Sequence, residues 1–161
     1  MKKIISFTIN GAKQELYLDT RKTLLKMLRE DLELMGVHLG CGGGDCGACT
    51  VLLNGEPVTS CLVLAVDCEG AEITTVEGVQ QNGELHPLQQ SMIEKGGIQC
   101  GFCTPGMVMN SLALLRENPQ PTETEVRQAL SGNLCRCTGY AKIVEAVLDV
   151  GNAMTNSKEA G

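Results

Sequence analysis

The spacing of hydrophobic residues changes partway along the chain, from strand-like alternation to helical periodicity. In the first half, apolar and polar residues alternate around Asn10-Gly11 and around Asn54-Gly55, two dipeptides typical of tight hairpin turns. Short strands are expected over residues 4–9, 13–18, 50–53, 57–59 and 72–76. The first half is therefore predicted to be a small sheet built from two hairpins and a final strand.

One helix is predicted within this first half. Apolar residues recur at helical spacing from Thr23 to Leu34, ahead of Gly36. Asp19 or Thr20 is expected to cap its N-terminus. Hairpins, helix and final strand together indicate a β-grasp-like domain.

The second half shows helical periodicity throughout. Thr104 is expected to cap a helix that has Pro105 in its first turn, and Thr122 with Glu125 has the spacing of a capping box. Helices are expected over residues 87–95, 104–118 and 122–130, with a last one around residues 143–148. The tail from Asn152 is expected to be frayed, and polar residues from Gln80 to Glu84 are the expected linker.

The chain has nine cysteines, and eight of them form two sets of four. The first set is Cys41, Cys46, Cys49 and Cys61, and the second is Cys100, Cys103, Cys135 and Cys137. C-x4-C-x2-C with a distant fourth cysteine is the plant-type [2Fe–2S] spacing. Five glycines among residues 40–47 allow backbone amides to approach inorganic sulfide. The expected fold class is therefore α+β, with a plant-type ferredoxin-like β-grasp domain (residues 1–77) and an all-α four-helix domain (residues 84–155).

The second set is not a ferredoxin spacing, although it also supplies the four thiolates that a [2Fe–2S] cluster uses. Cys103 precedes Thr104-Pro105, and Cys135 and Cys137 precede the last predicted helix, so two positive helix N-termini are expected to face the metal. Zinc is the alternative, because C-x2-C is also a zinc half-site. The glycine-rich loop argues against zinc in the first set, while zinc stays open for the second.

The remaining soft or titratable residues are interpreted as structural. Cys68 lies among apolar residues and is expected to be a buried small hydrophobe. His38 and His86 are expected to be structural or surface residues, and Met107 and Met109 to belong to the core. No constellation of catalytic residues stands out, so the chain is expected to move single electrons without substrate chemistry of its own.

Composition narrows the class of protein and its location. The chain is 43% hydrophobic with a formal net charge of −6 and 2% aromatic residues, which disfavours nucleic acid as a partner. Residues 1–10 lack the apolar core of a signal peptide, and no apolar run approaches the ~20 residues of a membrane span. A reducing cytoplasm is therefore expected, where clustered cysteines are metal ligands more often than disulfides.

Three motifs carry a family resemblance: Gly40–Val51, Gln99–Gly106 and Gly132–Tyr140. They resemble the small iron–sulfur subunit of the xanthine dehydrogenase family of molybdenum hydroxylases, over residues 4–150. The resemblance implies a large molybdopterin-binding subunit and a medium FAD-binding subunit as partners, with two copies of each subunit. It also implies electron flow from molybdopterin through the helical-domain cluster and then the ferredoxin-domain cluster to FAD. Gln99 and Cys137 would contact the pterin.

One departure from the family pattern bears on the assembly. Ala141-Lys142-Ile143 stands where large eukaryotic-type members usually have Arg-Pro, which favours a split, multi-subunit bacterial or archaeal enzyme. Two alternative functions are carried forward. One is a freestanding two-cluster ferredoxin that serves several redox partners, and the other is a zinc-binding scaffold.

Overall fold

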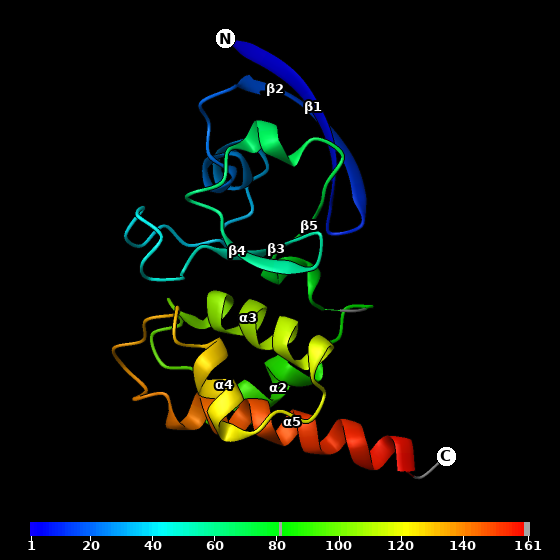
Figure 1. Cartoon of the computed structure of the whole chain (residues 1–161), viewed down its shortest axis with the longest axis vertical. Helices are drawn as coiled ribbons and strands as arrows, with labels where there is room; N and C mark the ends of the chain where they lie inside the picture. Colours follow the sequence, from blue (N-terminus) through cyan, green and yellow to red (C-terminus); the bar gives the residue numbers. More distant parts are fainter. Residues whose placement is uncertain (81, 160–161) are drawn as a thin grey trace.

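The computed structural model describes residues 1–80 and 82–159. Figure 1 shows a sheet-containing half packed on a helical half, which confirms the expected α+β class. The sheet has five strands in the order β2-β1-β5-β3-β4. Their bounds are Lys2–Ile9 (β1), Ala12–Asp19 (β2), Thr50–Leu53 (β3), Glu56–Thr59 (β4) and Glu72–Thr74 (β5).

Both predicted hairpins are confirmed. β1 pairs antiparallel with β2, β3 pairs antiparallel with β4, and β1 pairs parallel with β5 in the middle of the sheet. Both Asn-Gly turns have two left-handed residues, with φ of 49° and 82° at residues 10 and 11 and of 52° and 89° at residues 54 and 55. β5 ends at Thr74, two residues before the predicted end, because a 3-10 turn begins at Val76.

The helix in the first half differs from its prediction. It begins as α1 (Leu24–Lys26) and continues as one turn of π-helix over Met27–Asp31, so it stops short of Leu34. The expected caps Asp19 and Thr20 are wrong. Thr23 caps α1 by accepting a hydrogen bond from the Lys26 N–H, at 3.3 Å. Asp19 instead ends β2 and accepts hydrogen bonds from the backbone and side chain of Arg21.

The helical half contains the four expected helices, α2 (Pro87–Glu94), α3 (Thr104–Glu117), α4 (Glu123–Ala129) and α5 (Ala141–Glu159). The capping box of Thr122 and Glu125 at α4 is confirmed. Cys103 takes the cap position of α3, so Thr104 is the first helical residue and not the cap. The expected fraying from Asn152 is wrong, since α5 continues to Glu159. The expected linker includes Gln81, which lies outside the described residues.

The interior is divided into two hydrophobic cores. One surrounds the sheet and α1 and includes Ile5, Leu24 and Cys68, and the other lies among the four helices. Leu52 of β3 belongs to the core of the helical half, because α3 packs beneath β3 and β4 (Figure 1). The burial predicted for Cys68, Met107 and Met109 is confirmed, since each is 0% exposed. The domain limits at residues 77 and 84 stay a prediction.

Across the described part of the chain, we find no helix with both the length and the apolar character needed to cross a lipid bilayer.

Candidate iron–sulfur sites

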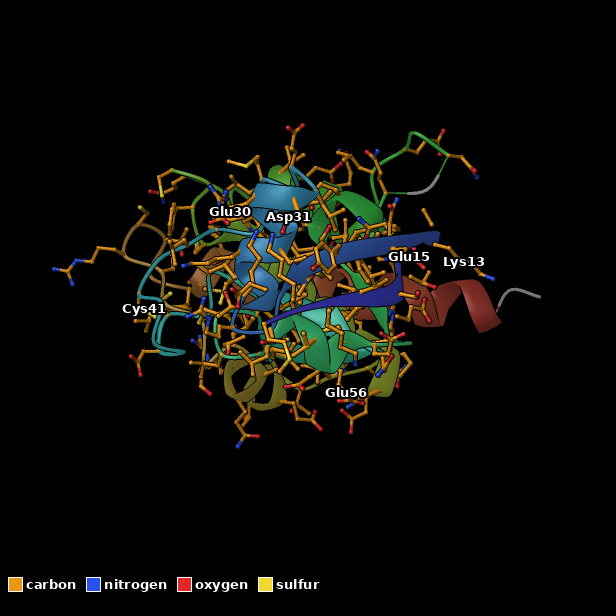
Figure 2. The ribbon with its side chains drawn as sticks, turned by 90° about the horizontal axis from the view of Figure 1, so that it is seen from above. Lys13, Glu15, Glu30, Asp31, Cys41 and Glu56 are labelled. Atoms are coloured by element: carbon orange, nitrogen blue, oxygen red, sulfur yellow. The ribbon has the colours of Figure 1, made fainter. Side chains whose placement is uncertain are left out.

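The first set of cysteines is assembled by the loop before β3 and by the β3–β4 hairpin. Cys41 and Cys46 lie in the loop, and Cys49 directly precedes β3. The hairpin returns the chain so that Ser60 donates to the Cys49 carbonyl oxygen from its backbone N–H (3.3 Å) and from its hydroxyl (2.7 Å). Cys61 is thereby fixed beside Cys49. Figure 2 shows Cys41 at the edge of the molecule, on the side opposite Lys13.

The loop of the first site points backbone donors at sulfur. The Gly43 N–H donates to Cys41 Sγ at 3.3 Å, and the Cys41 N–H donates to Cys46 Sγ at 3.4 Å. A Cβ added at Gly40 would lie 2.7 Å from Cys46 Sγ, so a larger residue there would fill the space beside the sulfur. Gly44 has a φ of +88°. This amide-lined loop fits a group held by anionic thiolates.

The environments of these thiols differ. The Gly43 N–H, followed by the N–H of Cys46, lowers the pKa of Cys41 to about 7. Burial, together with the neighbouring Cys49, raises the pKa of Cys61 to about 11. A bound metal must therefore displace a proton from Cys61 that the folded protein otherwise retains.

The second set of cysteines gathers at one end of the helical half. The Sγ atoms of Cys100 and Cys137 lie 3.5 Å apart, and Cys103 interacts with Cys135. α3 starts directly after Cys103, as expected. A turn over residues 138–140 separates Cys137 from α5, so this helix start is less direct than the sequence suggested.

The thiols of the second site also differ in pKa, and burial is one cause of the difference. Burial first, and then contact with Cys135, raises the pKa of Cys103 to about 12. Burial alone would raise the pKa of Cys135, but hydrogen bonds from the hydroxyl and backbone of Thr138 outweigh it and lower that pKa. The Sγ of Cys135 lies 3.1 Å from Thr138 Oγ1. Contact with Cys100 raises the pKa of Cys137.

In both sites the thiols form interacting pairs. The pairs are Cys41 with Cys46, Cys49 with Cys61, Cys100 with Cys137, and Cys103 with Cys135. Each site therefore supplies four thiolates, which is the number that a [2Fe–2S] cluster uses. Among the described residues, no three Cys, His, Asp or Glu side chains lie close enough together to hold one metal ion.

The second site has an exposed outer side. Cys100, Cys137 and Gln99 are exposed, whereas Cys103 is only 9% exposed. Gln99 and Cys137, the two residues expected to contact a pterin, lie on this side because Gln99 adjoins Cys100 and Cys100 contacts Cys137. A second molecule could therefore reach these residues without a change in the fold.

The two sites lie on the same side of the molecule (Figure 1). Three contacts that sequence reasoning did not predict join the two sites. The Leu134 N–H donates to the Cys46 carbonyl oxygen at 2.9 Å. The ring of His38 stacks on Phe102 with centroids 4.8 Å apart, and its Nδ1 lies 2.7 Å from the Phe102 carbonyl oxygen. Asn133 bridges the two loops, as described below. His38 is therefore structural, one of the two roles expected for it.

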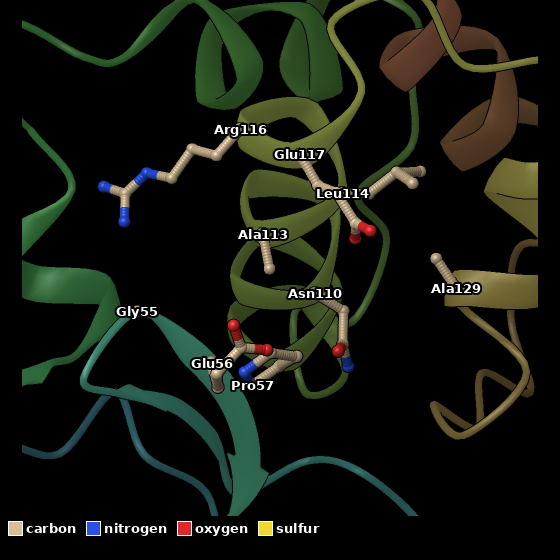
Figure 3. A pocket seen from close by; sticks show the side chains of 9 residues that line it. All are labelled: Gly55, Glu56, Pro57, Asn110, Ala113, Leu114, Arg116, Glu117 and Ala129. Carbon is tan, nitrogen blue, oxygen red and sulfur yellow. The ribbon is translucent and has the colours of Figure 1, made fainter.

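A groove of about 460 Å³ lies elsewhere, between the β3–β4 turn and α3 (Figure 3). Its lining includes Glu56, Asn110, Arg116 and Glu117 but no cysteine or histidine. This groove is therefore separate from the thiol sites.

Comparisons with known proteins agree with the two-site arrangement. Residues 7–76 match a family described as "2Fe-2S iron-sulfur cluster binding domain", and residues 75–148 match "[2Fe-2S] binding domain". The nicotinate dehydrogenase small FeS subunit of Eubacterium barkeri is 50% identical over 148 residues, covering 91% of this chain and 94% of that protein. The nicotine 6-hydroxylase small subunit of Paenarthrobacter nicotinovorans is 49% identical over 152 residues, covering 94% and 92%.

A solved structure is similar over nearly its whole chain. The crystal structure of quinoline 2-oxidoreductase from Pseudomonas putida 86 contains a chain that superposes with a TM-score of 0.93 at 46% identity. The match covers 98% of this chain and 97% of that one.

Proposed function

The chain belongs to the small iron–sulfur subunits of the molybdenum hydroxylase family, and we propose that each of its two thiol sites holds a [2Fe–2S] cluster. It is an electron-transfer subunit of a multi-subunit oxidoreductase. Its eight paired cysteines are the proposed ligands, four in each site. The observation that carries this proposal is that the fold brings cysteines from distant parts of the chain together at two places, with sulfur contacts inside each, in two halves that match [2Fe–2S]-binding families.

A bound [2Fe–2S] cluster supplies a carrier for one electron at a time. The protein's own contribution is to hold the thiolates and to direct N–H groups at their sulfurs, as Gly43 does at Cys41. Such hydrogen bonds to sulfur raise the reduction potential of a cluster by stabilising its added negative charge. Because Cys103 and Cys61 are buried and Cys41 and Cys100 are exposed, each cluster would have one shielded side and one open side.

The proposed partners are a large subunit that binds molybdopterin and a medium subunit that binds FAD, with two copies of each subunit in the assembly. The exposed side of the second site, with Gln99 and Cys137, is the proposed contact with the pterin. Exposed apolar residues border it, which supports a covered face in the assembly: Ile98, Phe102 and Leu134 are 36%, 47% and 60% exposed. A freestanding ferredoxin, whose contacts with its partners are transient, would need only a small docking surface.

The proposed location is the cytoplasm. All nine cysteines are free thiols in the structure, and a reducing compartment keeps thiols available for metal.

Purification of the native complex under anaerobic conditions tests this function. We expect two larger chains to co-purify with molybdenum and flavin, and two distinct paramagnetic signals to appear after dithionite reduction. Acid-labile sulfide should equal iron. Zinc without sulfide in the purified chain would contradict the proposal, and recovery of the chain alone with both clusters would favour the freestanding ferredoxin.

A further inference from the structure

Asn133 lies at the junction of the two thiol sites. It is 1% exposed and precedes Leu134 and Cys135 in the loop of the second site. A buried amide side chain is costly unless its polar atoms are hydrogen-bonded. Its partners therefore indicate what holds it there.

The side chain of Asn133 joins the two halves of the protein. Its Nδ2 donates to the Gly47 carbonyl oxygen at 3.0 Å, across 86 positions of sequence. Its Oδ1 accepts a hydrogen bond from Asn110 Nδ2 on α3. Because Gly47 directly follows Cys46, this amide fixes the loop of the first site against the helical half.

The backbone of Asn133 is fixed as well. Its N–H donates to the Leu130 carbonyl oxygen at 3.0 Å, and its carbonyl oxygen accepts from Tyr140 Oη at 3.0 Å. The same Tyr140 oxygen accepts the N–H of Cys135, at 2.8 Å. Hydrogen bonds thus hold both the side chain and the backbone of Asn133. Through Tyr140 they also hold the backbone of Cys135, so the position of Leu134 between them is fixed.

The consequence is a backbone-to-backbone hydrogen bond between the proposed ligand loops. The Leu134 N–H donates to the Cys46 carbonyl oxygen at 2.9 Å. A route of covalent bonds and this single hydrogen bond therefore runs from Cys135 Sγ to Cys46 Sγ. Electronic coupling decays more slowly along bonded atoms than across a gap, so the strength of the route depends on this contact.

We infer that Asn133 is a positioning residue that maintains the Leu134-to-Cys46 hydrogen bond and thereby sets the rate of electron transfer between the two sites. The inference rests on the proposed function. With clusters bound in both sites, a reduced helical-domain cluster would give up one electron and become oxidised, and the ferredoxin-domain cluster would accept that electron and become reduced. No bond is made or broken. Substitution of residues that hydrogen-bond to metal ligands commonly lowers metal affinity or activity about 10–100-fold.

The test uses the cluster-loaded full chain with three variants. Asn133→Leu keeps the branched shape and the number of side-chain heavy atoms of asparagine, and it removes both amide hydrogen bonds. Asn133→Ser is too short to reach Gly47 and introduces no clash, so it serves if Asn133→Leu fails to fold. Asn110→Ala is the matched control, because it removes the Asn110 contact and leaves the bond from Asn133 to Gly47 intact.

Three measurements are made on each variant: iron and sulfide content, spin–spin splitting between the two reduced clusters, and the rate of electron redistribution after rapid photoreduction. We expect both Asn133 variants to retain both clusters, to show altered splitting, and to redistribute electrons at least about tenfold more slowly. Faster hydrogen exchange at the Leu134 amide should accompany these changes. Asn110→Ala should stay close to the wild-type rate.

Three results would overturn the inference. A wild-type rate in either Asn133 variant would do so, and so would equal slowing in Asn110→Ala. Loss of a cluster in both Asn133 variants would show that Asn133 holds iron in place and does not control coupling. Absence of both clusters from the wild-type chain would instead overturn the proposed function, so the two failures are distinguishable.

Discussion

Gly47→Ala should weaken the junction between the two halves more than an ordinary glycine substitution does. Gly47 has a φ of +68°, and an added Cβ would lie 2.6 Å from Asn133 Nδ2 and would overlap the Gly132 carbonyl oxygen. The methyl group therefore meets the backbone and the buried amide of the other half. The Asn133 amide cannot move away without breaking its hydrogen bond to the Gly47 carbonyl oxygen.

The matched control is Gly70→Ala. Gly70 has nearly the same φ, +71°, but an added Cβ there would meet no atom within 4 Å. Both variants therefore share the cost of a left-handed alanine, about 1–2 kcal/mol. Only Gly47→Ala adds overpacking of about 1–3 kcal/mol and loss of the Asn133 hydrogen bond, about 1 kcal/mol.

The difference between the two variants is thus about 2–4 kcal/mol in the free energy of unfolding. For a chain of this size each kcal/mol lowers Tm by about 2–4 °C, so Gly47→Ala should unfold about 4–16 °C below Gly70→Ala. The assay is thermal unfolding of the cluster-loaded chain under anaerobic conditions, followed by far-ultraviolet circular dichroism at one scan rate. Equal Tm values for the two variants would refute the argument that this junction is tightly packed.

Three further predictions follow from individual side chains. Cys103→Ser should lower the iron content by one cluster, whereas Cys68→Ser should leave it unchanged; the opposite result would show that the ligands are wrongly assigned. Burial lowers the pKa of His86 below its usual value of 6.5. The stability that the neutral imidazole contributes is therefore fully present above pH 6.5 and is lost as the pH falls through the lowered pKa. Its Nδ1 caps α2, and His86→Asn should keep the cap while removing this part of the pH dependence of Tm. Thr122→Ala should cost about 1 kcal/mol in urea unfolding through loss of the α4 cap, with Thr122→Ser retaining most of it.

The elements that sequence reasoning predicted well are specified by neighbouring residues. The turns at Asn10-Gly11 and Asn54-Gly55 need only residues that adopt positive φ. The capping box at α4 needs only Thr122 and Glu125, three positions apart. Such signals lie within a few neighbouring residues, so the sequence pattern alone is enough to predict these elements.

The wrong predictions depend on partners that are distant or structurally unexpected. Asp19 is a good capping residue by type, but β2 extends to it and its carboxylate bonds to Arg21. The helix from Thr23 ends early, and beyond its end Arg29 donates to the carbonyl oxygens of Met35 and Val37, at 3.1 and 2.8 Å. The spacing of apolar residues gives no information about these side-chain hydrogen bonds.

The glycines of the first site show why sequence reasoning did not predict the junction between the two halves of the protein. The pattern assigned all of them to the metal, and Gly40 does lie against Cys46 Sγ. Gly47 faces the other half, where Gly106 of α3 leaves room for its carbonyl oxygen and Asn133 donates to it. One glycine-rich loop thus has two functions, since it admits sulfur on one side and a second domain on the other. A substitution at Gly40 should therefore act first on the sulfur of Cys46 in the first site, whereas one at Gly47 should disturb the relation between the two sites.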